Sequence, residues 1–503
     1  MLLMPARSAP PGATPAAAYE QRLEAALAAR QARGMLRALD PAPPAETLLV
    51  DFSSNDYISF ARSRELRQKL LSVLTEDTKV YGPPSSRLLD GNSPAHAALE
   101  HRLADFFLAP AALLFNSGFD ANVGLWTCLA DRADWIVFDE LVHASMHDGM
   151  RASRVLSARR LAFKHNSSAD LARTLEKLVR EDRGVASGTK SVWIGVESLY
   201  SMDGDLAPLL DIVETVERAL PRGNGHVIVD EAHSTGLYGP DGRGLVCALG
   251  LEDRVLVRVH TFGKAMACSG AAVLASPLIR NYLINYARPL IYSTTMTYLS
   301  VLAIDKSLEM LEQGRANERA ARVHGLATRL VTRLAAALPE TGPTGSNDLV
   351  LPPHLLAIAA STATAVSSSS SQSAPDPTSR TRRLTVRRAP GAAVTVPATS
   401  PIVPLLTRSP RPLSAYLRTK GYLVRPITYP TVPRGEERIR VCLHAENTER
   451  DVDGLVEALR GWVRSGAGAN KEEVAGSHEG ETKRLAKKAA GERQAAVAMK
   501  ARL

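Results

Sequence analysis

Between about Tyr81 and Gly314, short apolar runs alternate with stretches of helical spacing, and this alternation limits the possible folds more strongly than any other feature. The apolar runs are DWIVFD, SVWIGVESL, HVIVD and RVLVRVHTFGK, and helix-like segments such as DLARTLEKLVRED and PLLDIVETVERAL occur between them. Such alternation is typical of a mainly parallel sheet covered by helices. We therefore predict an α/β fold in which residues 81–314 form a large domain.

The segments that flank this region predict smaller units. Residues 19–39 have helical spacing and good helix-forming residues, so that 19–80 are expected to form an N-terminal helix and a linker segment. Residues 315–466 include the strand-like SPIVPLLT and ERIRVCLHAE and are expected to form a smaller α+β C-terminal domain.

Three segments are too polar or too biased in composition to form a core. A Ser/Thr/Pro/Arg-rich tract at about 358–398 is predicted to be a disordered insertion, at a surface loop where extra length costs little closure entropy. Residues 1–18 are expected to be a disordered N-terminus and 467–503 a flexible charged tail.

The letters DEAH, from Asp230 to His233, raise the alternative of a nucleic-acid-dependent ATPase. Such an enzyme needs an upstream G-x-x-x-x-G-K-[ST] loop for the phosphates. The one Gly-Lys pair, Gly263-Lys264, lies downstream, and Ala265 follows it. Of the net charge of +9, residues 360–400 carry +4 and residues 470–503 carry +3, which leaves only +2 on the rest. We therefore expect no nucleic-acid partner.

Other features narrow the class of protein. The chain has no C-x-x-C pair, which argues against a disulfide framework and a zinc site and indicates a reducing compartment. No apolar run reaches 18 residues, so no membrane span is expected. The N-terminus is too rich in proline for a secretory signal, and an organellar presequence is only weakly supported. His143 and His147 have i,i+4 spacing without the glutamate of H-E-x-x-H, so we expect no metal site.

Reactive side chains follow three of the predicted strands: Ser201, then Asp230 with His233, and then Thr261 with Lys264. Because the carboxyl ends of parallel strands share one edge of a sheet, these groups are expected to converge there. Each residue alone has an ordinary role, as a helix cap or a solvated charge. Together they suit pyridoxal phosphate, which needs a lysine for its Schiff base and an acid at its ring nitrogen.

The phosphate of such a cofactor also needs donors. Gly118 and Phe119, in NSGFDAN, lie at an expected helix start, where backbone N–H groups bind anions. We predict that they hold the phosphate together with the hydroxyl groups of Ser201 and Thr261.

Nine motifs then occur in order: FSSNDYISF, SRLLDG, NSGFDAN, DELVHASMHDG, ESLYSMDGDLAPL, VDEAHSTGLYGPDGRG, HTFGKAMACSGAAV, IYSTTM and PTVPRGEERIRV. In order and spacing they resemble the α-oxoamine synthases, a family of fold-type I pyridoxal phosphate enzymes. The resemblance covers about residues 20–465 apart from the insertion. It implies a transferase that joins an amino acid to an acyl-CoA with loss of the amino acid carboxylate as CO2.

The resemblance also implies roles for particular residues. Lys264 would anchor the cofactor and remove the Cα proton, while Asp230 would hold the ring nitrogen protonated. His233 would bind the phenolic oxygen of the ring, and His143 would stack on its face. Arg440 would pair with the amino acid carboxylate, for which a guanidinium fork is well suited.

Further contacts follow from the same resemblance. The remaining expected substrate contacts are Arg37, Asn55, Ser86 and Thr431. Thr294 or Thr295, in IYSTTM, would reach the phosphate of the other subunit, so that a homodimer with shared active sites is implied.

Within the family, Ser86-Arg87-Leu88 resembles the 8-amino-7-oxononanoate synthases of biotin synthesis, which use L-alanine and pimeloyl-CoA. Alternatives are 5-aminolevulinate synthases, serine palmitoyltransferases, condensing enzymes of secondary metabolism and a catalytically inactive copy of the fold. Pro83 and Pro84 stand where relatives have glycines, near the expected amino acid site.

The last three residues, Ala501-Arg502-Leu503, are a conservative variant of the S-K-L peroxisomal address. They follow a basic segment that the catalytic domain does not require. We expect the peroxisomal import receptor as a partner, with a cytoplasmic location as the alternative.

Overall fold

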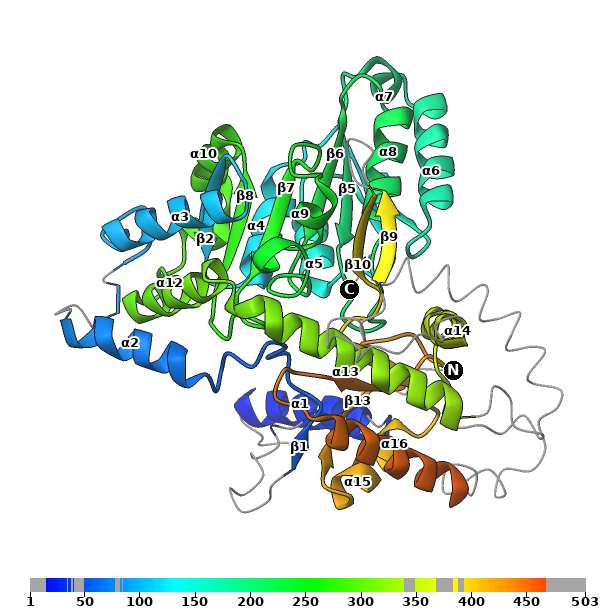
Figure 1. The fold of residues 1–503 in the computed structure, drawn as a ribbon. Coiled ribbons are helices and arrows are strands. Elements are labelled where there is room, and N and C mark those ends of the chain that lie inside the picture. The colour runs from blue at the N-terminus through cyan, green and yellow to red at the C-terminus, as the bar shows by residue number, and fades with distance from the viewer. Residues whose placement is uncertain are drawn as a thin grey trace.

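The computed structural model describes residues 15–33, 35–37, 39, 49–76, 82–83, 85–338, 349–367, 383–387 and 393–466 (Figure 1). The expected tail, Pro84 and the C-terminal Ala501-Arg502-Leu503 lie outside the described residues.

A seven-stranded sheet forms the centre of the large domain, with the order β2-β8-β7-β6-β5-β3-β4. Its strands are β2 (Ala111–Phe115), β3 (Trp135–Asp139), β4 (Arg160–Phe163), β5 (Val192–Glu197), β6 (Gly225–Asp230), β7 (Val257–Thr261) and β8 (Ala271–Ala275). Strand β8 is antiparallel to both of its neighbours, and the pairs from β7 to β4 are parallel. The prediction of a mainly parallel sheet is therefore confirmed.

Helices pack around this sheet (Figure 1). They are α3 (Pro94–Phe106), α4 (Gly118–Cys128), α5 (Ala144–Ala152), α6 (Ser168–Glu181), α7 (Arg183–Ser187), α8 (Leu209–Ala219), α9 (Leu245–Leu249), α10 (Pro277–Tyr286), α11 (Arg288–Ile291) and α12 (Tyr298–Glu312). Helix α2 (Arg64–Glu76) lies farther from the sheet and packs against α12. Serine side chains cap four of these helices: Ser93 for α3, Ser117 for α4, Ser167 for α6 and Ser276 for α10 each accept a hydrogen bond from a backbone N–H of the helix. These caps fix the residue at which the backbone turns into each of these helices.

The C-terminal domain is built on a small antiparallel sheet in which β14 (Arg438–Cys442) lies between β11 (Ile402–Leu406) and β13 (Arg425–Ile427). Its helices are α13 (Arg315–Ala337), α14 (Pro353–Ser367), α15 (Pro410–Thr419) and α16 (Glu449–Arg464). A short parallel pair, β1 (Val50–Asp51) with β12 (Tyr422–Leu423), joins the N-terminal segment to this domain. The smaller α+β unit is thus present.

The structure differs from two expectations, one about the N-terminal helix and one about the insertion. Helix α1 runs over Pro15–Ala32, so it begins inside the segment expected to lack structure and ends before residue 39. The insertion expected to be disordered contains the end of α14 (Pro353–Ser367) and an antiparallel hairpin of β9 (Arg383–Arg387) and β10 (Ala393–Pro397).

The amino-acid composition of the β9 and β10 segments explains why they form a hairpin. Its strands, RLTVR and AVTVP, are rich in the β-branched residues Val and Thr, which favour strands, but the overall composition of the tract concealed this signal. Val396 is buried in the core of the large domain, so this part of the insertion packs against the rest of the protein.

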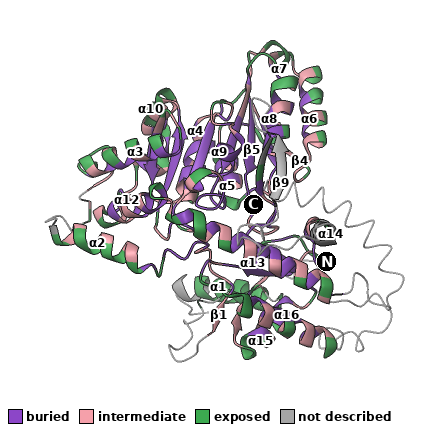
Figure 2. Cartoon of the chain, in the orientation of Figure 1, coloured by how far each residue is buried: buried purple, intermediate pink, exposed green. Residues whose placement is uncertain are grey.

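Burial divides the described residues into two cores (Figure 2). The larger core surrounds the seven-stranded sheet, and the smaller one joins α13, α15, α16 and the antiparallel sheet. Within the described part of the chain, no helix is both long and apolar enough to cross a membrane.

Candidate active site

The carboxyl ends of the parallel strands carry the reactive side chains that the sequence singled out. His143 follows β3, Ser201 follows β5, Asp230 ends β6, and Thr261 ends β7 three residues before Lys264. Because β3, β5, β6 and β7 run parallel, these ends lie along one edge of the sheet. The structure therefore places the expected groups where a ligand binds in this class of fold.

A chain of hydrogen bonds links Asp230 to His143. Oδ2 of the buried Asp230 accepts from Nδ2 of Asn122 at 2.8 Å, and the same nitrogen donates to Oγ of Ser145 at 3.0 Å. That oxygen lies 2.8 Å from Nδ1 of His143, which also accepts from the backbone N–H of Ser145 at 3.2 Å. Since Nδ1 is an acceptor, the proton of neutral His143 is on Nε2. The ring's orientation is thus fixed relative to Asp230.

Lys264 is half-buried beside two carboxyl groups. Burial lowers the pKa of Lys264, while Asp230 and Glu197 oppose this shift. A lowered pKa favours the neutral amine, the form that attacks an aldehyde carbon.

Glu197 is a second acid at this edge. It is opposite Asp230 in the register of β5 and β6, and it is buried. Burial and the charge of Asp230 both raise the pKa of Glu197 well above its ordinary value. The sequence analysis did not single it out, although it lies in the motif ESLYSMDGDLAPL.

His233 is hydrogen-bonded to Tyr57 of the N-terminal segment, and Tyr57 in turn contacts Arg440 of the small domain. Its Nδ1 lies 2.7 Å from the phenolic oxygen of Tyr57, which is fully buried. Arg440, on the central strand of the small sheet, donates from Nη2 to Oδ1 of Asn55 at 3.1 Å and to the Tyr57 oxygen at 3.4 Å. Burial lowers the pKa of His233, and Lys264 and Arg440 lower it further. The imidazole is therefore neutral.

Arg440 keeps guanidinium donors that the protein does not use. Its guanidinium is buried, and among the described residues its Nε has no hydrogen-bond partner. An unpaired buried guanidinium nitrogen is costly unless an acceptor binds there, and a carboxylate is the acceptor that fits the guanidinium geometry.

Gly118 and Thr261 form a close contact that only glycine permits. A Cβ atom added to Gly118 would lie 2.4 Å from Oγ1 of Thr261. The first turn of α4 therefore reaches the end of β7, and backbone N–H groups there lie near a hydroxyl group. Phe119 follows in this turn with its side chain 45% exposed.

The two threonines of IYSTTM have different environments. Thr295 is buried, and its Oγ1 lies 3.3 Å from Nε2 of His96. The Thr294 side chain is exposed, and its backbone is bridged to Ser86 and bonded to Asn116. Of the two threonine side chains, only that of Thr294 is exposed in this chain.

The structure does not bring three of the expected residues to the hydrogen-bonded site. Arg37 and Thr431 have exposed side chains, on the segment after α1 and on the turn before β14. Ser201 lies on the β5–α8 loop, and no hydrogen bond in the described residues joins its side chain to the site. Their roles stay predictions.

Four residues at the site were not singled out from the sequence: Tyr57, Asn122, Ser145 and Glu197. Each lies inside a motif that carried the family resemblance. The sequence signal that could have identified them was therefore the motif itself, close to the residues that were chosen. His147, by contrast, packs edge-on against Phe138, and the described residues contain no group of three His, Cys, Asp or Glu that could hold a metal ion.

The residues present fit pyridoxal phosphate. Lys264 supplies the amine, Asp230 the acid for the ring nitrogen, and His233 a neutral imidazole for the phenolic oxygen. The glycine contact between α4 and β7 leaves backbone N–H groups for a phosphate.

Comparisons with known proteins agree with this geometry. Residues 48–459 match the family model described as "Aminotransferase class I and II". The chain is 40% identical over 417 residues to 8-amino-7-oxononanoate synthase of Emericella nidulans, which covers 82% of this chain and 89% of that protein. It is 34% identical over 453 residues to aminoacyl transferase sphA of Byssochlamys spectabilis, covering 89% and 88% of the two chains.

Solved structures show the same fold. Serine palmitoyltransferase of Sphingomonas wittichii superposes with a TM-score of 0.67 at 22% identity and covers 90% of this chain and 99% of its own. 8-Amino-7-oxononanoate synthase from Francisella tularensis superposes with a TM-score of 0.57 at 23% identity, over 83% and 99% of the two chains.

Proposed function

Because the chain belongs to the aminotransferase class I and II family, in its α-oxoamine synthase group, we propose that it condenses L-alanine with pimeloyl-CoA. The products would be 8-amino-7-oxononanoate, CoA and CO2. The enzyme class, a pyridoxal phosphate-dependent transferase that joins an amino acid to an acyl-CoA, follows from the family itself. The choice of alanine and pimeloyl-CoA is supported by the 40% identity to the fungal 8-amino-7-oxononanoate synthase.

One observation carries the chemistry. The carboxylate of Asp230 and the amine of Lys264 lie at the carboxyl ends of the paired strands β6 and β7, where burial lowers the pKa of Lys264. Bound pyridoxal phosphate supplies an electron sink for the negative charge that develops at Cα. Asp230, held by Asn122 and the backbone of Ala232, keeps its two oxygens in place for the ring nitrogen.

The other residues orient the substrate and move a proton. Arg440 would bind the carboxylate of the incoming amino acid through guanidinium N–H groups that have no protein partner. The amine of Lys264, once released from the cofactor, would accept the Cα proton. His143 covers one face of the site with a ring that Ser145 holds in place.

A second function has its own support. The sphA aminoacyl transferase is 34% identical over a longer stretch, 453 residues, so a different acyl donor is the alternative. The fold does not distinguish between these two functions, because enzymes with other acyl donors have it too: serine palmitoyltransferase structures share the fold at 22% identity.

The test is a matched comparison of substrate pairs on protein reconstituted with pyridoxal phosphate. We expect alanine with pimeloyl-CoA to release CoA and CO2 faster than glycine with succinyl-CoA or serine with palmitoyl-CoA. Lys264→Ala is the control and should lose both the visible absorbance of the bound cofactor and the release of CoA. Faster turnover of another pair would reassign the substrates, and a wild type that binds no cofactor would refute the proposal.

A homodimer with shared sites is part of the proposal, with Thr294 as the residue supplied by the other subunit. Mixed dimers of Lys264→Ala and Thr294→Ala subunits would then contain one intact site. Random mixing should restore about a quarter of wild-type activity, since half of the dimers are mixed and each has one good site. A Thr295→Ala partner, at the buried threonine, is the comparison. No recovery from the Thr294 pair would place that residue outside the shared site.

Peroxisomal import through Ala501-Arg502-Leu503 is likewise a proposal. A fluorescent protein fused ahead of residue 1 should give punctate peroxisomal signal that becomes diffuse without these three residues. Diffuse signal from the intact fusion would contradict it.

A further inference from the structure

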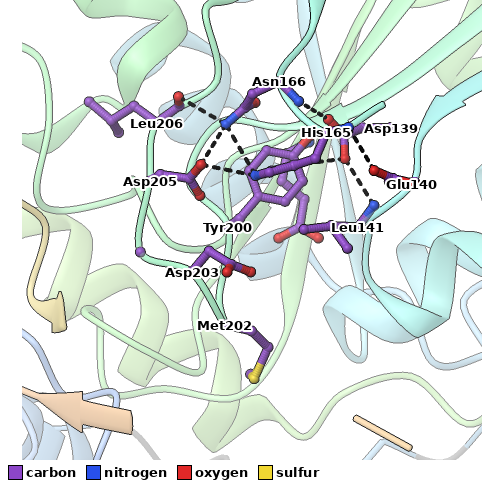
Figure 3. A network of polar contacts seen from close by, with 12 residues as sticks. Asp139, Glu140, Leu141, His165, Asn166, Tyr200, Met202, Asp203, Asp205 and Leu206 are labelled. Carbon is purple, nitrogen blue, oxygen red and sulfur yellow. Dashed lines mark hydrogen bonds and ion pairs between the residues drawn. The ribbon is translucent and has the colours of Figure 1, made fainter. Parts of the chain in front are cut away.

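A second group of charges lies at the same sheet edge, apart from the residues assigned above (Figure 3). His165, two residues after β4, is placed between two aspartates: Nδ1 is 2.9 Å from Oδ1 of Asp139, and Nε2 is 2.9 Å from Oδ2 of Asp205. Asp139 is fully buried, and the His165 side chain is 20% exposed.

The protonation of His165 follows from its partners. An ionised carboxylate only accepts hydrogen bonds, so each ring nitrogen must donate and the imidazole carries both protons. Although burial lowers the pKa of His165, the hydrogen bonds to Asp139 and Asp205 raise it to about 10. His165 is therefore a cation throughout the neutral range and acts as a permanent link between the two carboxylates.

On one side the link reaches His143. Oδ1 of Asp139 also accepts from the backbone N–H of Leu141 at 2.9 Å, and the Asp139 carbonyl accepts from Val142 at 3.2 Å. These bonds shape the turn that ends at His143, the N-cap residue of α5.

On the other side the link reaches the β5–α8 loop, residues 198–208. The carbonyl of Asp205 accepts from the backbone N–H of Tyr200 at 3.1 Å, and this bond closes the loop. The Tyr200 ring packs edge-on against His165 at 4.5 Å between centroids, and Asn166 donates a second bond to Oδ2 of Asp205 at 2.8 Å.

The same loop is bound to the small domain. Arg438, whose side chain is 2% exposed, donates to Oδ1 of Asp203 at 2.6 Å and to the carbonyl of Met202 at 3.0 Å. Ser400 donates to the carbonyl of Gly204 at 2.7 Å. Arg438 precedes Arg440 by two residues on β14, so both side chains leave the same face of that strand.

We propose that His165 is a positioning residue that fixes the β5–α8 loop against the turn before His143, and so sets the placement of Arg440 relative to the cofactor face. It acts through the two carboxylates, and within the described residues its ring forms no hydrogen bond to His143 or Arg440. The inference rests on the proposed amino acid condensation, because that function gives His143 and Arg440 their roles.

The test variant is His165→Gln, in which the amide can donate to only one aspartate and turns an oxygen toward the other. In the cofactor-free protein, we expect the backbone amides of residues 141–143 and 200–206 to exchange hydrogen at least about tenfold faster, because local opening becomes easier. With cofactor bound, the concentration of amino acid that half-saturates the change in cofactor absorbance should rise about tenfold. The KM for the acyl-CoA should stay within about twofold of wild type.

The matched control is His226→Gln, at the start of β6 on the opposite edge of the sheet. His226 is also half-buried, but its Nε2 is bonded to a hydroxyl, Oγ of Ser191, at 3.0 Å. We expect wild-type exchange at both segments and wild-type amino acid binding for this variant.

Asp205→Asn tests the same link if His165→Gln does not fold. Because both changes break one connection, the double variant should be no worse than the poorer single variant. Wild-type exchange and amino acid binding in the variant that folds would overturn the positioning role. A wild type whose cofactor spectrum responds to no amino acid would instead refute the proposed function, while the exchange data would still decide the role of His165.

Discussion

The phenolic oxygen of Tyr57 lies 2.7 Å from Nδ1 of His233, and this contact joins the N-terminal segment to the end of a central strand of the large sheet. Arg440 of the small domain donates to the same oxygen at 3.4 Å. One hydroxyl group therefore connects His233 of the large domain with Arg440 of the small domain, and it belongs to neither domain's sheet.

Tyr57→Phe removes this hydroxyl with little change of shape. A neutral hydrogen bond contributes about 1 kcal/mol, so kcat/KM for the condensation should fall about fivefold. Burial raises the pKa of Tyr57, so the phenol is neutral and the loss should not depend on pH between about 6 and 9. Steady-state kinetics across that range would check both statements, and an effect that grows steeply with pH would contradict the assignment.

Arg440→Lys and Arg440→Ala separate charge from geometry. Arg440→Ala should weaken amino acid binding by about 2–5 kcal/mol, because a partly desolvated carboxylate loses its charged partner. Arg440→Lys should recover only part of this loss, since an ammonium group cannot form the two parallel bonds of a guanidinium. Spectroscopic titration of the bound cofactor with alanine measures both, and cofactor affinity itself should change little.

Gly118→Ala tests the contact between α4 and β7. The new methyl group would lie 2.4 Å from Oγ1 of Thr261, so the first turn of the helix or the threonine must move. We expect weaker cofactor binding, by about tenfold, and a loss of stability of about 1–3 kcal/mol from overpacking. Equilibrium dialysis and thermal unfolding measure the two effects.

The double variant Gly118→Ala with Thr261→Ala supplies the control. Removing the threonine side chain beyond Cβ relieves the shortest contact, so stability should recover in part. Cofactor binding should stay weak, because the hydroxyl group is lost. Full recovery of binding would show that Thr261 does not contact the phosphate.

The charge on His165 makes stability depend on pH in a definite direction. Its pKa rises on folding from 6.5 to about 10, so the folded state binds the proton more tightly than the unfolded state. The stabilisation is fully present below about pH 6.5 and is lost as the pH rises through about 10. Relative to His165→Gln, the free energy of unfolding should fall by at most about 1.4 kcal/mol per pH unit in that window. Denaturant unfolding at pH 6, 8 and 9.5 measures the difference, which should be smallest at the highest pH.

The sequence predicted the large domain well because each buried strand is a short, nearly continuous apolar run. HVIVD and SVWIGVESL became β6 and β5. The end of β6 carries Asp230, which was expected at the sheet edge, whereas Glu197 at the end of β5 was not singled out. The β9–β10 hairpin was missed because a serine-rich stretch beside it dominated the composition.

The candidate site was predictable only in part, for a different reason. Asp230 and Lys264 lie at strand ends and could be found by position, whereas Tyr57 acts through a contact with a residue 176 positions away. Such a contact depends on how the N-terminal segment folds back, which no local pattern encodes. Thr294 and Thr295 are adjacent in the sequence, and only the structure distinguishes them, because Thr294 is exposed and Thr295 is buried.

Strand β8 runs against both of its neighbours, so Lys264 lies on a short return between two paired strands and not on a strand-to-helix loop. The return is closed at its base by the Thr261 and Ala271 pair and by hydrogen bonds between Phe262 and the residues Cys268 and Gly270. Because this connection is hydrogen-bonded at both ends, the backbone of Lys264 has a fixed position relative to the sheet. Any shift of the Lys264 backbone along the sheet would therefore have to break pairing between β7 and β8.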